Sequence, residues 1–458
     1  MPRTTAELRA LDAAHHLHPF SDMKSLNAEG SRVIVKADGV WLTDSDGNFI
    51  LDGMSGLWCV NVGYGRDEIV DAVAAQMREL PYYNTFFKTT HQPAIDLAAK
   101  LAELTPPQFN KVFFTGSGSE SNDTVIRLVR RYFDIKEKPE KKIIISRRNA
   151  YHGSTVGAAS LGGMAPMHAQ GGLPIPDIIH IAQPYFWGEA RQGETPEEFG
   201  LRTAQALEHA IDAMGEDRIA AFIAEPIQGA GGVIIPPSTY WPEIARICRE
   251  RDILFVSDEV ICGFGRTGEW FGCETFDTQP DILVMAKGIT SGYMPLGGVM
   301  VADRVAEVML EGGDFNHGYT YSGHPAACAG ALANLAIMQR EKLVERVASD
   351  VGPYLKARWS ALAEHPLVGE APMLGLLGAL ELTPDKTGRT KFADVGKVGT
   401  LARDFSFKNG LVMRAVRDRL IIAPPLVISH EECDALVARV RQTLDDTYAE
   451  VKRWGWVR

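Results

Sequence analysis

Ile253-Leu254-Phe255-Val256, followed directly by Ser257 and Asp258, is an apolar run of the length of one buried β-strand. Runs of the same kind recur at residues 112–114, 143–145, 178–181, 220–223 and 282–285. Amphipathic segments separate them; in residues 241–251, Ile244, Ile247 and Cys248 fall on one helical face. This alternation predicts an α/β fold with a large, mostly parallel sheet that helices cover on both faces.

The two ends of the chain have a different pattern. Apolar residues 40–42 and 49–51 flank an Asp-Gly turn, which predicts a β-hairpin. After about residue 330 helical patterns dominate, and the last helix begins at a capping box of Ser429 and Glu432. A chain of 458 residues usually forms two domains. We therefore predict a large α/β domain at residues 61–329 and a smaller α+β domain that combines residues 1–60 with residues 330–458.

The composition excludes several classes of protein. Hydrophobic residues make up 45% and the formal net charge is −11, which argues for a globular protein and against a nucleic-acid partner. We find no signal peptide at residues 1–20 and no apolar stretch of the roughly 20 residues that span a bilayer, so we expect a cytoplasmic protein without a membrane partner. The six cysteines form no C-x-x-C pair, and His15, His16 and His18 have no second cluster beside them. We predict reduced cysteines and no metal.

The first chemically unusual segment is Thr115-Gly116-Ser117-Gly118-Ser119-Glu120-Ser121-Asn122. Small residues that lead into a helix expose backbone N–H groups and the positive end of the helix dipole, which suits a phosphate group. Ser117 and Glu120 also match a capping box. The segment alone is weak evidence, because such a turn is more often only a helix cap.

Two ionisable residues follow buried runs. Asp258 would be costly there unless a cation meets it, and in most sheets such an aspartate caps a helix or pairs with an arginine. Lys287 ordinarily would extend to solvent; burial would instead lower its pKa from about 10.4 and free the amine for imine chemistry.

A phosphate seat, a strand-end carboxylate and a strand-end lysine together are what pyridoxal 5'-phosphate (PLP) requires. The lysine would carry the cofactor as a Schiff base, and the carboxylate would keep the ring nitrogen protonated. Once a substrate amine displaces it, the lysine would act as the general base at the substrate carbon. We predict Lys287 and Asp258 as the catalytic residues and PLP as the cofactor.

The chain resembles the class III, fold-type I, PLP-dependent aminotransferases, and within them the ω-amino acid and amine:pyruvate transaminases. The resemblance covers nearly the whole chain and is most specific at residues 117–121, 151–153, 225–229, 258–268 and 286–288. Ile261 stands where relatives that act on ornithine or γ-aminobutyrate have Gln, which favours the pyruvate-using subgroup.

The resemblance implies further cofactor contacts. Tyr151 and Val260 would press the two faces of the ring, and Gly118 and Ser119 would hold the phosphate together with Thr320 of a neighbouring subunit. Without it, we would interpret Tyr151 and Val260 as core residues and Thr320 as a turn residue. A homodimer with shared sites is therefore implied, and pairing into a tetramer stays open. The implied cofactor-binding set is Gly118, Ser119, Tyr151, His152, Glu225, Asp258, Val260, Lys287 and Thr320.

The resemblance also implies a pocket for two unlike substrates. Arg414 resembles the mobile arginine that grips the carboxylate of a keto acid and swings out for an apolar donor, and Glu225 would hold it between ligands. Arg417 and Arg419 are close in sequence and could take this role instead. Most single arginines are ordinary surface residues, and this interpretation also applies to Arg414. Aromatic clusters usually belong to the hydrophobic core, but Phe20, Trp58, Phe86 and Phe87 occur in segments that match substrate-pocket segments of the subgroup. The implied substrate-binding set is Phe20, Leu57, Trp58, Phe86, Phe87, Tyr151, Ala230 and Arg414.

The sequence thus predicts a ping-pong ω-aminotransferase. An ω-amino acid or amine (of the β-alanine, diamine or aralkylamine type) would convert PLP to pyridoxamine phosphate, which would then aminate pyruvate. Two alternatives stay open: another PLP reaction on the same fold, such as an aminomutase or decarboxylase, and a non-catalytic scaffold that retains the fold. Retention of Lys287, Asp258 and the phosphate turn together argues against the scaffold.

Overall fold

The large sheet is the centre of the fold. In the computed structural model, which describes residues 3–457, its strands lie in the order β4-β10-β9-β8-β7-β5-β6. β10 is antiparallel to both neighbours, and the other adjacent pairs are parallel, which confirms the predicted α/β fold. The strands are β4 (Phe109–Thr115), β5 (Ile143–Arg147), β6 (Ile178–Ile181), β7 (Ile219–Ala224), β8 (Leu254–Asp258), β9 (Ile282–Met285) and β10 (Gly297–Ala302).

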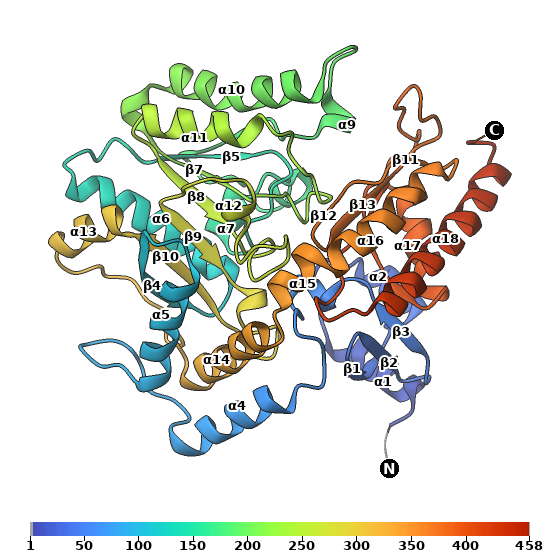
Figure 1. Ribbon diagram of the computed structural model, residues 1–458, viewed down its shortest axis with the longest axis horizontal. Helices are drawn as coiled ribbons and strands as arrows, with labels where there is room; N and C mark the ends of the chain where they lie inside the picture. Colours follow the sequence, from blue (N-terminus) through green and yellow to red (C-terminus); the bar gives the residue numbers. More distant parts are fainter. Residues whose placement is uncertain (1–2, 458) are drawn as a thin grey trace.

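Helices cover both faces because the strands are apolar on both sides. In β8, Leu254 and Val256 pack into one core with α6 and α13, whereas Phe255 packs on the opposite face with α10 and α11 (Figure 1). The helices from residue 67 to 340 are α4 (Asp67–Glu79), α5 (Gln92–Leu104), α6 (Gly118–Ile135), α7 (Val156–Leu161), α8 (Ala165–His168), α9 (Phe186–Glu189), α10 (Pro196–Met214), α11 (Tyr240–Glu250), α12 (Gly272–Thr275), α13 (Asp303–Glu311) and α14 (Pro325–Arg340), with 3₁₀ turns η1 (Glu216–Arg218) and η2 (Lys287–Ile289).

Two smaller sheets join the ends of the chain. The predicted hairpin is confirmed, since β2 and β3 pair antiparallel, and β14 adds parallel to β3. The N-terminal and C-terminal segments therefore lie side by side (Figure 1). The first of these sheets has the order β1-β2-β3-β14 and the second β11-β13-β16-β15, with β12 beside β13. Their strands are β1 (Ile34–Asp38), β2 (Trp41–Asp44), β3 (Phe49–Asp52), β11 (Val368–Glu370), β12 (Met373–Leu374), β13 (Leu377–Leu382), β14 (Leu411–Val412), β15 (Arg414–Val416) and β16 (Arg419–Ile422).

The remaining helices pack around these two smaller sheets. The domain boundaries at residues 60/61 and 329/330 stay a prediction. The capping box of Ser429 and Glu432 is confirmed at the start of the last helix. All six cysteines are free. Within residues 3–457, no helix combines the length and the apolar character needed to cross a membrane. These helices are α1 (Thr5–His15), α2 (Met23–Glu29), α3 (Ser55–Trp58), α15 (Leu343–Ser349), α16 (Val351–Ser360), α17 (Lys397–Lys408) and α18 (His430–Arg453), with the 3₁₀ turn η3 (Ala361–Glu364).

Candidate active site

A cavity of about 400 Å³ lies at the carboxyl ends of β8 and β9, beside the N-terminus of α6. Ligands of open α/β sheets bind at such strand ends. Every residue of the cofactor-binding set given above lines this cavity except Thr320: Gly118, Ser119, Tyr151, His152, Glu225, Asp258, Val260 and Lys287.

The carboxylate of Asp258 is buried and held by three donors. Its Oδ2 accepts from Nδ1 of His152 at 2.7 Å and from Nδ2 of Asn122 at 2.9 Å, and its Oδ1 accepts from the backbone N–H of Val260 at 3.2 Å. No lysine or arginine of residues 3–457 forms an ion pair with it. The fixed carboxylate therefore remains available to a cationic ring nitrogen.

Lys287 follows β9 and begins the turn η2. Its φ of 51° lies in the left-handed region, which is uncommon for a residue with a side chain. Burial lowers the pKa of Lys287, and the positive charge of Arg414 adds to this, while Asp258 and Glu225 oppose it. A lowered pKa enlarges the fraction of neutral amine, which is the nucleophilic form.

The start of α6 supplies the phosphate seat. Ser117 caps the helix by accepting from the N–H of Glu120 at 3.2 Å, and the first-turn N–H groups of Gly118 and Ser119 have no intrahelical acceptor. The predicted capping box is wrong in its second half, because Oε2 of Glu120 accepts from the N–H of Gly116 at 2.6 Å instead of from Ser117. The carboxylate of Glu120 thus binds the backbone at Gly116, one residue before the N-cap residue Ser117.

The wall opposite is formed by Tyr151, Val260 and Glu225. A Cβ at Gly118 would lie 3.1 Å from Cγ2 of Val260, so the glycine keeps the cavity open beside that side chain. Glu225 accepts from the N–H groups of Tyr151 at 3.1 Å and Gly229 at 2.9 Å, and burial raises its pKa. The carboxylate of Glu225 thus fixes the backbone of Tyr151 and, with it, the position of the Tyr151 ring.

These residues fit PLP. The donor set offers free helix-terminal N–H groups for a phosphate, a fixed carboxylate for a protonated ring nitrogen, and an amine of lowered pKa for an aldehyde. The Nε2 atom of His152 is buried without a hydrogen-bond partner, and its Nδ1 holds Asp258 at the edge of the cavity.

Arg414, the first residue of β15, lies over the indole of Trp58. Its Cζ is 5.1 Å from the ring centroid, and Nζ of Lys287 is 5.5 Å from the same centroid. The predicted contact between Arg414 and Glu225 is not seen within residues 3–457, where each Glu225 oxygen accepts from a backbone N–H group instead. Within residues 3–457 Arg414 forms no ion pair, and burial lowers its pKa. An unpaired, half-buried guanidinium is prepared for an incoming carboxylate.

A second, larger cavity of about 1050 Å³ adjoins Arg414 and is lined by Phe20, Tyr185 and Arg417 among others. Arg419 also reaches it but is not free to move, since it pairs with Glu370 and Glu381 and donates to the carbonyl of Gly232. Arg417 is exposed, with only a 3.5 Å contact to Asn149. Of the three arginines, Arg414 is therefore the one that lies between Trp58 and this larger cavity.

The remaining pocket candidates fall into two groups. Trp58 and Ala230 are buried in one core cluster that Tyr151 contacts, and the ring of Phe20 lies 6.4 Å from that of Tyr151. Leu57, Phe87 and Thr320 are exposed and, like Phe86, line neither cavity. Of these candidates only Phe20 lines a cavity; Trp58 and Ala230 lie buried behind Tyr151, and the second group lies outside the cavity of its own chain.

Several residues of the site lie outside the predicted sets, among them Asn122 and Cys59. Asn122 binds Asp258 and the carbonyl of His152, and Cys59 lines the cavity. Asn122 lies in the quoted 115–122 segment, and its place one turn after the helix start was the available signal. Nothing in the sequence around Cys59, which follows Trp58, indicated a place in the site.

The N-terminal histidines bind a carboxylate. His16 Nδ1 lies 3.1 Å and His18 Nε2 2.9 Å from Oδ1 of Asp12. These ligand atoms lie near enough to one another to hold an ion, but the hydrogen bonds already account for the cluster. The absence of a metal stays a prediction.

The chain matches the class III aminotransferase family over residues 25–444. Among characterised relatives, the putrescine–pyruvate aminotransferase of Pseudomonas aeruginosa is 56% identical over 98% of both chains. The diaminobutyrate–2-oxoglutarate transaminase of Halomonas elongata is 41% identical over 97% of this chain and 95% of its own.

The fold also matches solved structures of ω-transaminases. The ω-transaminase of Pseudomonas jessenii in complex with PMP has a TM-score of 0.95 at 40% identity, covering 97% of this chain and 99% of its own. The thermostable (S)-enantioselective ω-transaminase of Thermomicrobium roseum has a TM-score of 0.94 at 45% identity, covering 98% of this chain and all of its own.

Proposed function

The chain belongs to the class III aminotransferases and is a PLP-dependent ω-aminotransferase, and we propose that it moves an amino group from a short diamine to pyruvate. The relative with 56% identity is named for putrescine and pyruvate. The observation that carries the proposal is the unpaired guanidinium of Arg414 over Trp58, because it provides a site for a carboxylate that a diamine lacks and pyruvate has.

The chemistry divides between the cofactor and the chain. When bound, PLP supplies an aldehyde for the substrate amine and a ring that accepts electrons. The N–H groups of Gly118 and Ser119 would hold its phosphate, and Asp258 would keep the ring nitrogen protonated. Nζ of Lys287 takes the proton from the amine-bearing carbon of the donor and returns one to the corresponding carbon of the acceptor.

The donor end of the site lacks a spare carboxylate. Asp258 is reserved for the ring nitrogen of the cofactor, and both oxygens of Glu225 accept from backbone N–H groups. The second ammonium of a diamine would meet the indole face of Trp58 once the guanidinium of Arg414, now 5.1 Å from the ring centroid, has swung away. A cation over an aromatic face gains about 0.5–2 kcal/mol.

A homodimer accounts for the aromatic residues outside the cavity. Tyr82 donates to the carbonyl of Thr320 at 2.7 Å, and Phe86 lies close enough to Gly318 to exclude a Cβ there. Residues 82–87 and 318–322 thus share one surface, which would complete the cavity of a second subunit with Thr320, Phe86 and Phe87. The cytoplasmic location stays a prediction.

The test is a donor panel with the PLP-loaded protein. 1,4-Diaminobutane, β-alanine and pentylamine are each supplied with pyruvate, and alanine is measured. We expect 1,4-diaminobutane to give the highest kcat/KM and no turnover without a keto acid. Product formed without a keto acid would indicate a mutase, and released carbon dioxide a decarboxylase; either result contradicts the proposal. A Lys287→Arg variant is the inactive control.

A further inference from the structure

Helix α14 carries one fully buried amide on an otherwise apolar face. Asn334 is 0% exposed and lies among alanine, leucine and isoleucine residues in Pro325–Arg340. Its Nδ2 donates to the carbonyls of Gly288 at 2.9 Å and Ile289 at 3.0 Å, while its Oδ1 has no partner. A half-satisfied buried amide is unfavourable for stability, so a hydrophobic residue would suit the helix better.

The two carbonyls belong to the turn that begins at Lys287. The N–H of Ile289 reaches Ala286 at 3.3 Å and that of Thr290 reaches Lys287 at 3.2 Å, which makes a single 3₁₀ turn. A turn this short offers little hydrogen bonding of its own, and its first residue has a left-handed φ. The amide of Asn334 therefore supplies what the turn lacks.

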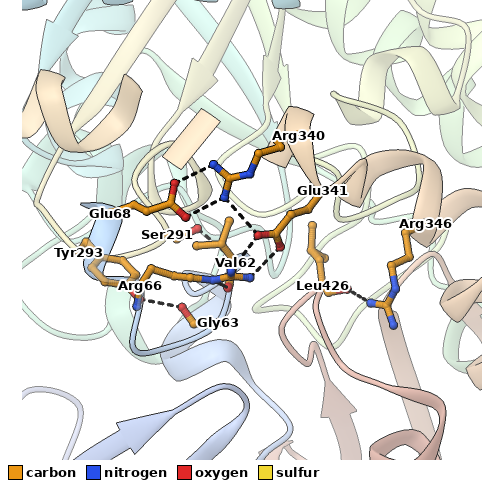
Figure 2. Close-up of polar contacts among 10 residues, drawn as sticks. All are labelled: Val62, Gly63, Arg66, Glu68, Ser291, Tyr293, Arg340, Glu341, Arg346 and Leu426. Carbon is orange, nitrogen blue, oxygen red and sulfur yellow. Dashed lines mark hydrogen bonds and ion pairs between the residues drawn. The ribbon is translucent and has the colours of Figure 1, made fainter. Parts of the chain in front are cut away.

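The opposite side of the turn is packed without space. A Cβ at Gly288 would lie 2.7 Å from Nδ2 of Asn61 and 3.0 Å from Cβ of Phe264. Further on, Oγ of Ser291 accepts from the N–H of Val62 at 3.2 Å (Figure 2). The turn is thus held between α14 and residues 61–62.

Helix α14 is itself anchored to α4. At its end, Arg340 forms two hydrogen bonds of 2.7 Å with Glu68, and the adjacent Glu341 binds Arg66 through two of 2.8 Å (Figure 2). Tyr293, beyond the lysine turn, donates to Gly63 and accepts from the N–H of Arg66. The amide of Asn334 therefore projects from a fixed support.

We propose that Asn334 is a positioning residue that fixes the direction in which the Lys287 side chain enters the cavity. The inference rests on the proposed role of Lys287 in proton transfer. Proton transfer depends steeply on geometry, and a displacement of about 1 Å can lower a rate by about 100-fold. The turn, not the helix, uses the hydrogen bonds of this amide.

The test replaces Asn334 with leucine, which has nearly the same shape and cannot donate. We expect Asn334→Leu to remain folded and PLP-bound, with the rate constant of the donor half-reaction lowered about 10- to 100-fold. The primary deuterium isotope effect should rise, because proton transfer becomes slower, and the donor dissociation constant should change less than about twofold. The pH midpoint of the cofactor absorbance should also move, and this measurement needs no donor.

The control is Met338→Leu, whose sulfur touches Asn334 but whose residue forms no hydrogen bond to the turn. It should change the half-reaction rate less than about twofold. Unchanged rate, isotope effect and absorbance midpoint in Asn334→Leu would overturn the inference, as would failure of both Asn334→Leu and Asn334→Ala to fold, since Asn334 would then be a stability residue. If the wild type did not accept diamines but Asn334→Leu still shifted the absorbance midpoint, only the proposed donor would be contradicted.

Discussion

Nδ1 of His152 lies 2.7 Å from Oδ2 of Asp258, and both side chains are buried. Because an ionised carboxylate only accepts, the ring must carry its proton on Nδ1, and the histidine aims the carboxylate. A hydrogen bond to a charged group contributes about 1.5–3 kcal/mol. We expect His152→Ala to weaken PLP binding and lower kcat, each about 10- to 100-fold, measured by cofactor dissociation and steady-state kinetics.

A matched control is His209→Ala on the exposed side of α10, which should change neither quantity. Asn122→Ala should act in the same direction as His152→Ala, since Asn122 donates to the same oxygen at 2.9 Å. Wild-type PLP retention in the double variant would show that the two donors do not orient Asp258.

Arg414 provides the second prediction. If its guanidinium receives the acceptor carboxylate, Arg414→Ala should raise the KM for pyruvate by about 10- to 100-fold, the value of a charge-assisted contact. An aldehyde acceptor, which has no carboxylate, should be affected less than about threefold. Arg403→Ala, an exposed arginine on α17, serves as the control. Equal losses with keto acid and aldehyde would assign Arg414 to structure.

The indole of Trp58 separates donors by charge. Trp58→Phe keeps an aromatic face, whereas Trp58→Leu removes it. A cation–π contact of about 0.5–2 kcal/mol corresponds to about 2- to 30-fold in kcat/KM. We expect Trp58→Leu to lower kcat/KM for 1,4-diaminobutane by that factor more than for pentylamine, with Trp58→Phe between it and wild type. The same loss for both amines would mean that Trp58 only shapes the pocket.

The sequence was sufficient for six of the seven strands of the large sheet, because buried strands have a strong local signature. It missed β10, whose two glycines resemble a turn; the strand forms because Val299 and Val301 pack into the core beside β4 and β9. Asp258 and Lys287 could be found because ionisable groups after apolar runs are rare.

Contacts between distant residues could not be predicted in the same way. Asn122 meets Asp258 across 136 positions, and Asn334 meets Gly288 across 46, so no spacing rule connects either pair. Glu225, the expected partner of Arg414, accepts instead from the backbone N–H groups of Tyr151, after the neighbouring strand β5, and of Gly229, four residues along its own loop. In each case the folded backbone, not the residue type, decides which acceptor is free.

Glu259 gives a prediction for pH. The carboxyl is fully buried after β8 and accepts from the N–H groups of Gly272 and Cys273, both at 2.7 Å. Burial raises its pKa from 4.5 to about 7. The folded state therefore binds the proton more tightly than the unfolded state, so the associated stability is complete below pH 4.5 and is lost as the pH rises through 7. This change in pKa corresponds to about 3 kcal/mol.

We expect the melting temperature of the PLP-loaded wild type to fall between pH 5 and pH 8 by more than that of Glu259→Gln. The amide cannot ionise, so the variant should lose this part of the pH dependence, although it is less stable at pH 5 because its NH₂ faces a backbone donor. Glu311→Gln at the exposed end of α13 should keep the wild-type slope. Parallel melting curves for wild type and Glu259→Gln across this range would show that Glu259 stays ionised in the folded protein and that its two backbone donors outweigh its burial.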